Sequence, residues 1–172
     1  MFRRGRTLLS IALSKLTPYD GAVFRGAWLS AEEARLYVPG NLRGEAGFTS
    51  ATADPSKFFP GDVRLQIFSR GGKDVSHLSF SPQEMEVVFD KGTLFYVRGS
   101  GFDAEMEKHV VKLIDMTVDD EADALVPISP EGLVAADAAF DRLRRDILAV
   151  PPERRERVDS AKLVTPVAEV VV

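Results

Sequence analysis

The sequence predicts a β-rich fold in which short strands pair in an antiparallel, sandwich-like arrangement. Two observations predict it. About six short runs rich in β-branched and aromatic residues are separated by turn residues, as in all-β sheets. Little helix stands between these runs, whereas βαβ units would need a long helical segment after each strand. The helical patterns lie mainly near the two ends of the sequence.

Composition limits the classes of function. The 172 residues most simply form one domain that can bury a core, and 45% hydrophobic and 28% charged residues are ordinary for a soluble globular protein. A net charge of -4 argues against nucleic-acid binding. The absence of cysteine excludes disulfides, thiolate metal sites and cysteine nucleophiles. His77 and His109 are too isolated to predict a metal site, and no stretch approaches the ~20 apolar residues of a membrane span.

The first elements follow from spacing and from capping residues. Four apolar residues at helical spacing, with basic neighbours, favour a short amphipathic helix over a signal peptide; they are Leu8, Ile11, Ala12 and Leu16. Turn residues 17–21 lead into a strand at 22–26. Ser30 with Glu33 three residues later predicts the N-cap of a short helix that ends near Pro39.

The remaining strands are expected at 47–52, 63–69, 86–89, 93–97 and 110–116. Glu84 and Glu86 stand one residue apart where a loop becomes a strand, so strand alternation would place both carboxylates on one face. After an acidic linker, Ser129-Pro130 predicts the start of a helix that Pro151 ends. The expected division is a core at 1–117 and a linker, helix and extension at 118–172, packed on the same domain.

Three motifs carry candidate chemistry. They are Phe24-Arg25-Gly26, Phe48-Thr49-Ser50-Ala51-Thr52 and Glu84-Met85-Glu86-Val87-Val88-Phe89. Each motif taken alone is more often solvated strand surface. Their order and spacing, from residue 8 to about 116, resemble the arginine-type mono-ADP-ribosyltransferases, a family with an arginine strand, a Ser-Thr-Ser-like strand and a Glu-x-Glu before an apolar strand. Ala51 departs from this pattern, so only Ser50 and Thr52 carry over as hydroxyl residues.

The resemblance implies an α+β fold with two roughly orthogonal antiparallel sheets around an NAD cleft and flanking helices. It implies that Glu86 stabilises the oxocarbenium-like transition state of nicotinamide–ribose cleavage, and that Ser50 holds the Glu86 carboxylate. It implies that Glu84 orients the acceptor guanidinium and accepts its proton, since glutamate at this position accompanies arginine acceptors. No metal is implied.

The NAD contacts implied by the resemblance come from Ser50 and from four further positions. Arg25 would bind the pyrophosphate through its forked guanidinium, and Gly26 would let the backbone approach the nicotinamide carboxamide. Thr52 would line the cofactor site. Phe58 or Phe59 would stack on the nicotinamide ring, with Phe59 preferred.

The expected activity is transfer of ADP-ribose from NAD to an arginine of a target protein, by a bacterial toxin or effector domain that is secreted or delivered into a target cell. An immunity protein is a candidate partner; a membrane or nucleic-acid partner is not expected. Two alternatives stay open: NAD hydrolysis or a nucleic-acid acceptor, and a catalytically silent NAD-binding or interaction module. Intact Arg25, Ser50 and Glu86 argue against the silent module.

Overall fold

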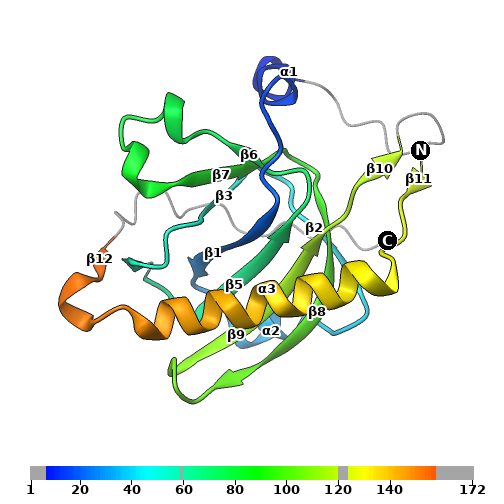
Figure 1. Cartoon of the computed structure of the whole chain (residues 1–172). Helices are drawn as coiled ribbons and strands as arrows, with labels where there is room; N and C mark the ends of the chain where they lie inside the picture. The colour runs from blue at the N-terminus through cyan, green and yellow to red at the C-terminus, as the bar shows by residue number, and fades with distance from the viewer. Residues whose placement is uncertain (1–6, 59, 120–123, 158–172) are drawn as a thin grey trace.

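The protein is described by a computed structural model that covers residues 7–58, 60–119 and 124–157. Eight strands form one mixed sheet in the order β2-β8-β9-β5-β1-β3-β7-β6, and two strand pairs lie outside it (Figure 1). The strands of the main sheet are β1 (Gly21–Ala27), β2 (Leu42–Gly44), β3 (Thr49–Thr52), β5 (Val63–Ser69), β6 (Lys73–Asp74), β7 (Glu86–Phe89), β8 (Leu94–Asp103) and β9 (Lys108–Asp115). The other elements are α1 (Leu8–Ser14), α2 (Ala31–Arg35), α3 (Pro130–Ala149), the two-residue strands β4 (Lys57–Phe58), β10 (Val118–Asp119), β11 (Ala124–Leu125) and β12 (Glu156–Arg157), and the 3-10 turns η1 (Ser76–Leu78), η2 (Pro82–Glu84) and η3 (Pro152–Arg154).

The main sheet bends into two halves at the β1–β3 junction. A single register pair, Phe24 with Thr52, joins these strands, whereas seven pairs join β1 to β5. The larger half is β2-β8-β9-β5-β1 and the smaller is β3-β7-β6. Phe89 of β7 and Phe95 of β8, five strands apart in the order, meet edge to face with ring centroids 5.4 Å apart. The two halves therefore face each other across a shared core, which makes the arrangement sandwich-like.

That shared core is apolar because alternate residues of both halves point into it. Its buried members include Val23, Ala51, Leu65, Ile67, Val87, Phe89, Phe95, Val97, Val111 and Leu113. Burial of this much aliphatic and aromatic surface, at roughly 25 cal/mol per Å², supplies the main stabilisation of the sheet.

Helix α3 covers the outer face of the larger half, across β1, β5 and β9 (Figure 1). The hydroxyl of Ser129 accepts from the amide of Gly132 and Pro130 is the first helical residue, which explains why the helix begins where the sequence predicts. Its apolar stripe recurs at helical spacing and is buried; it consists of Ala136, Phe140, Leu143 and Ile147. Phe24 and Ile114 of the sheet lie beneath it.

A second stripe of α3 is charged and reaches the hairpin formed by β8 and β9. Ion pairs in the described ranges make this contact: Asp137 with Arg98 at 2.6 Å, Asp141 with Lys112 at 3.9 Å, and Arg144 with Asp103 at 2.6 Å and also with Glu105 of the hairpin turn. Because positions 137, 141 and 144 are four and three residues apart, they share one face of the helix. Ion pairs and apolar packing thus fix the helix along two adjacent faces.

The predicted α+β class is confirmed, and β5 and β7 have the predicted bounds. The length of one hairpin and the direction of one strand pair differ from the expectation. The hairpin of β8 and β9 extends well beyond residue 97, through Gly99 and Gly101. The pair β5–β9 is parallel, because the chain leaves β5 for β6 and β7 of the smaller half before it returns. No helix in the described ranges is long and apolar enough to cross a membrane.

Candidate active site

The hydroxyl of Ser50 donates a hydrogen bond to Oε1 of Glu86. Ser50 lies in the middle of β3, and Glu86 is the first residue of β7, paired with Thr52. Ala51 and Val87, which alternate with Ser50 and Glu86, point into the core, so both functional side chains point to the opposite face. Both are only half-buried, so the carboxylate is held by the sheet and remains open to solvent on one side.

Glu84 is not on the strand with Glu86, and the expected placement of both carboxylates by strand alternation is wrong. Pro82 begins the 3-10 turn η2, which ends at Glu84. Met85 then has a left-handed backbone, with φ of 45°, and the strand starts only at Glu86. Proline favours such a turn, and a positive φ at a methionine is uncommon outside tight turns and functional sites. Glu84 therefore projects from a turn beside the strand.

Thr52 fastens this turn to the sheet. Its hydroxyl donates to the main-chain oxygen of Glu84 at 2.5 Å and accepts from the amide of Asp54 at 3.0 Å. The amide of Ala53 also donates to the main-chain oxygen of Met85 at 3.0 Å. Thr52 is almost fully buried. Its described hydrogen bonds support the turn at residues 82–85, called here the carboxylate turn because it carries Glu84. Its predicted contact with NAD stays a prediction.

Arg25 lies in a buried polar cluster with Tyr37, Arg43 and Glu45. The exposed fractions of these side chains are 8%, 3%, 7% and 8%. The guanidinium carbon of Arg43 lies 5.6 Å from the centre of the Tyr37 ring, a cation–π contact. Main-chain hydrogen bonds with Gly92 and Thr93 anchor Glu45. In the described ranges, Nε of Arg25, Nε of Arg43 and the Tyr37 hydroxyl have no hydrogen-bond partner.

Burial dominates the electrostatics of this cluster. It lowers the pKa of Arg25, and the Glu45 carboxylate opposes that shift. Burial likewise raises the pKa of Glu45, against the effect of Arg25 and Arg43. The pKa of Tyr37 is raised by burial and, to a smaller extent, by Glu45. Arg25 and Glu45 therefore each favour the charged form of the other away from water.

The structure brings together four of the predicted residues: Ser50 with Glu86, and Thr52 with Glu84. It places Arg25 and Gly26 on β1, which is the neighbour of β3 and lies two strands from β7, and in the described ranges no hydrogen bond or ion pair joins Arg25 to Ser50 or Glu86. Phe59 lies outside the described residues, and of Phe58 only its place in β4 is described. The predicted NAD contacts of Arg25 and Gly26 stay predictions.

Sequence reasoning missed the partners of Arg25. Arg43 lies in the three-residue strand β2 and Glu45 directly follows it, in a stretch too short to show a strand pattern. Tyr37 follows α2, where an aromatic residue predicts only general packing. A sequence signal was available in retrospect, since Arg43 and Glu45 alternate at strand spacing.

The arrangement offers a fixed carboxylate, a hydroxyl that positions it, and a second glutamate on an adjoining turn. Such a set suits chemistry that passes through a positively charged sugar, because a preorganised carboxylate stabilises that charge. In the described part of the chain, no group of three His, Cys, Asp or Glu side chains is placed to hold a metal ion.

Comparison with curated proteins finds relatives for part of the chain. Over 111 residues, 62% of this chain, it is 38% identical to Mav, a candidate NAD(+)–arginine ADP-ribosyltransferase of Mycobacterium avium (strain 104). Over 86 residues, 49% of the chain, it is 37% identical to the NAD(+)–protein-arginine ADP-ribosyltransferase Tre1 of Pseudomonas putida (strain GB-1). The alignments cover 14% and 17% of these two proteins, so the chain corresponds to a small part of each. No protein-family profile matches the sequence.

Solved structures agree with the fold. The type III effector XopAI of Xanthomonas axonopodis pv. citri superposes with a TM-score of 0.57 and 23% identity, over 64% of this chain and 50% of the effector. Exoenzyme S of Pseudomonas aeruginosa, solved with human 14-3-3 protein beta and bound to Carba-NAD, gives a TM-score of 0.51 and 22% identity over 62% of this chain and 55% of that chain. By sequence, part of this chain is similar to curated bacterial arginine ADP-ribosyltransferases, and its fold is similar to those of XopAI and exoenzyme S.

Proposed function

We propose that this chain transfers ADP-ribose from NAD to an arginine side chain of a target protein. The observation that carries the proposal is the hydrogen bond from Ser50 to Glu86, which joins two motifs 36 residues apart in the sequence. The named activity of the curated relatives, NAD(+)–arginine ADP-ribosyltransferase, supports the same assignment.

Glu86 is assigned to the sugar. As the bond between ribose C1′ and the nicotinamide nitrogen breaks, the bonding pair leaves with neutral nicotinamide and positive charge develops on the ribose. A carboxylate already held by Ser50 stabilises that charge without first having to reorganise. Glu86 is also suited to accept a hydrogen bond from a ribose hydroxyl, because its second carboxylate oxygen is not the one bound by Ser50.

Glu84 is assigned to the acceptor. A guanidinium nitrogen forms the new bond to C1′ and loses one proton, which Glu84 accepts. The hydrogen bond from Thr52 fixes the main chain of Glu84, so the turn holds this carboxylate next to Glu86 without making it part of the strand. A separate placement lets one carboxylate serve the sugar and the other serve the attacking nitrogen.

We assign the NAD contacts to Arg25, Gly26, Ser50, Thr52 and Phe59, as the resemblance implies. The guanidinium of Arg25 supports this assignment, because its Nε has no protein partner in the described ranges and a forked cation suits a pyrophosphate. Residues 1–117 then form the catalytic core, and residues 118–172 extend it.

We infer that the domain acts on a protein after delivery into a target cell, with an immunity protein as a further partner. The support is that the fold is shared with a type III effector. The delivery of the whole protein into a target cell, and the proteins that it modifies there, both belong to this proposal.

The test is incubation of the purified protein with NAD and agmatine, a simple guanidine, followed by mass spectrometry of the product. We expect ADP-ribosylated agmatine from the wild type and a rate about 10²–10³-fold lower from Glu86→Gln, the loss typical of one electrostatic stabiliser. Glu32→Gln, an exposed glutamate on α2, is the matched control and should retain the full rate. Full activity of Glu86→Gln would refute the assignment.

A further inference from the structure

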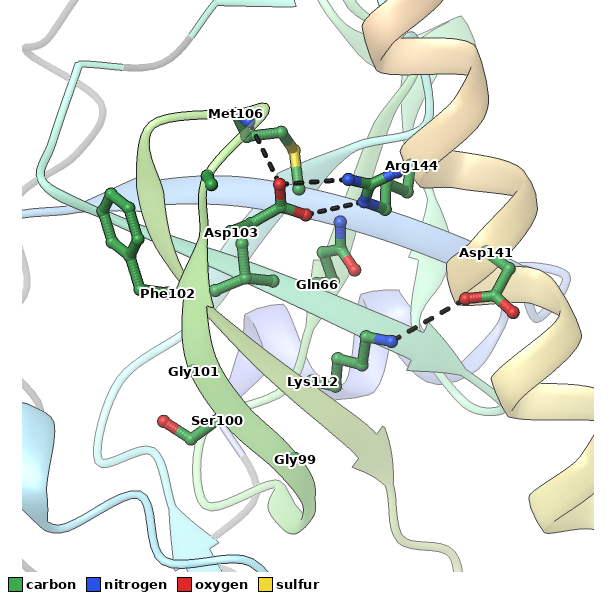
Figure 2. A pocket seen from close by; sticks show the side chains of 12 residues that line it. Gln66, Gly99, Ser100, Gly101, Phe102, Asp103, Met106, Lys112, Asp141 and Arg144 are labelled. Atoms are coloured by element: carbon green, nitrogen blue, oxygen red, sulfur yellow. Dashed lines mark hydrogen bonds and ion pairs between the residues drawn. The ribbon is translucent and has the colours of Figure 1, made fainter.

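A pocket of about 670 Å³ lies between α3 and the hairpin of β8 and β9 (Figure 2). Figure 2 shows Gln66 of β5 in the middle of it, with Lys112 and Asp141 on one side and Asp103 and Arg144 on the other. The remaining wall is the glycine-rich part of β8 with Met106 and Val110. A volume of this size falls within the usual range of small-molecule sites, roughly 300–1,000 Å³.

Gln66 is the feature that needs explanation. It lies in the middle of β5, its exposed fraction is 0%, and it lines the pocket. In the described ranges, neither Nε2 nor Oε1 of its amide has a hydrogen-bond partner. Burial of an amide without partners is destabilising, and a close-packed strand would normally carry an apolar residue there. Both atoms belong to a group that lines the pocket, but neighbouring side chains cover them from solvent in this conformation, so an occupant must displace those side chains to pair with the amide.

The pocket is separate from the site proposed for NAD. In the register of the sheet, Phe24 lies between Gln66 on one side and Thr52 on the other, and Leu143 and Ile147 of α3 cover it. The helix therefore stands between the pocket and the carboxylate turn. Arg25, next to Phe24 in β1, points to the opposite face.

The charges around the pocket cancel. Lys112 pairs with Asp141 at 3.9 Å, and Arg144 pairs with Asp103 at 2.6 Å. Arg144 also pairs with Glu105, which does not line the pocket. Among the lining residues, two cations and two carboxylates are paired, so the lining itself has no excess charge to attract an ion. An occupant is then selected by the amide on the floor, which offers one donor group and one acceptor group side by side.

We propose that this pocket binds a small neutral molecule that presents an adjacent hydrogen-bond donor and acceptor, such as a primary carboxamide or the edge of an amino-substituted heterocycle. A glutamine amide recognises such an edge through two hydrogen bonds, as it does the N6 and N7 positions of adenine. These two hydrogen bonds would give Nε2 and Oε1 of Gln66 a partner each.

The experiment is NMR titration of the whole protein with two separate probes, adenine for the heterocycle and nicotinamide for the carboxamide. The readout is the side-chain amide signal of Gln66, which reports on this pocket whether or not the protein has transferase activity. We expect a saturable shift with at least one probe. No shift of this signal with either probe at millimolar concentration would overturn the proposal.

Two variants make the titration specific. Gln66→Met keeps the volume but removes the amide, so the shifts of the neighbouring Gly99 and Lys112 main-chain signals should be lost. Gly99→Val leaves Gln66 intact and narrows the pocket; an added Cβ would meet only the Cδ of Lys112, at 4.0 Å, so the fold should tolerate it. Unchanged probe binding in both variants would place binding elsewhere and overturn the proposal.

The melting temperature of Gln66→Met gives an independent result. If the amide serves a ligand, the variant without ligand should melt at or above the temperature of the wild type, because it no longer buries an unpaired polar group. A lower melting temperature together with no probe shift in the wild type would mean that Gln66 has only a structural role, and would overturn the proposal.

Discussion

Ser50 and Glu86 are joined by a hydrogen bond across the β3–β7 pair, although their motifs are separated by more than thirty residues of sequence. A strand holds each of them, so their relative position is set by sheet register and not by loop conformation. Register of this kind is well specified because Ala51 and Val87, the alternate residues, are buried in the core.

Replacement of Ser50 by alanine should lower kcat about 10- to 100-fold. A hydrogen bond to a charged group is worth about 1.5–3 kcal/mol, and without it the Glu86 carboxylate is free to rotate. The measurement is the initial rate of agmatine modification at saturating NAD. Ser14→Ala, an exposed serine on α1, is the control. An unchanged kcat for Ser50→Ala would mean that the sheet alone positions Glu86.

Replacement of Glu84 by glutamine should separate two activities. Transfer to agmatine should fall at least about 10²-fold, since a positioned base contributes 10²–10⁴-fold, while slow NAD hydrolysis continues through Glu86. Both rates are measured on the same preparation, as modified agmatine and as released nicotinamide. Equal losses in the two rates would assign Glu84 to the NAD site and would remove the main support for an arginine acceptor.

Thr52→Val tests the support of the carboxylate turn. Valine keeps the shape and the strand preference but removes the hydroxyl that holds Glu84 and Asp54. The free energy of unfolding should fall by about 1–3 kcal/mol, measured by urea denaturation, and transfer should fall more than NAD hydrolysis. A variant whose two activities fall together would indicate that Thr52 acts on NAD directly.

Arg25→Lys should raise the KM for NAD about tenfold or more and leave kcat within a few-fold, because lysine keeps the charge but loses the forked geometry. Arg43→Lys is the matched control, as Arg43 is equally buried beside Glu45 and also has an Nε without a partner in the described ranges. A similar rise in KM for both variants would show that the cluster as a whole, and not Arg25, governs NAD affinity.

Acid should weaken the attachment of α3. Hydrogen bonds from Arg144 lower the pKa of Asp103, and hydrogen bonds from Arg98 lower the pKa of Asp137. A carboxyl with a lowered folded-state pKa contributes stability that is fully present above its unfolded value of about 3.9 and is lost as the pH falls through the folded value. Melting temperatures between pH 6 and pH 2.5 should therefore decline below about pH 4, and less steeply in Arg144→Met.

Sequence reasoning succeeded where a local sequence signal agrees with the tertiary fold. The strand at 63–69 alternates clearly, Ser129-Pro130 is a strong helix start, and the hydrogen bond of Ser50 to Glu86 is the one that the family resemblance implied. In each case a local signal and the tertiary fold point to the same structure.

Sequence reasoning failed where contacts with distant parts of the chain decide the local structure. Gly99 and Gly101 weaken strand propensity, yet the hairpin continues because β9 pairs with β8 and because Asp103 and Arg98 are held by α3. The turn at Glu84 was also missed, since a left-handed methionine leaves no mark in sequence. The burial of Gln66 depends on packing between β5 and α3, which no local pattern reports.

The left-handed backbone at Met85 places Glu84 and Glu86, two residues apart in sequence, in different structural elements, a turn and a strand. Glu86 is positioned by the register of the sheet, and Glu84 by a turn whose main chain is bonded to Thr52. Under the roles proposed for the two glutamates, a change of residue at position 84 would alter the preferred acceptor and leave the register of Glu86 intact. One chain segment would thus be able to vary in the residue that it modifies while it keeps the same means of cleaving the sugar bond.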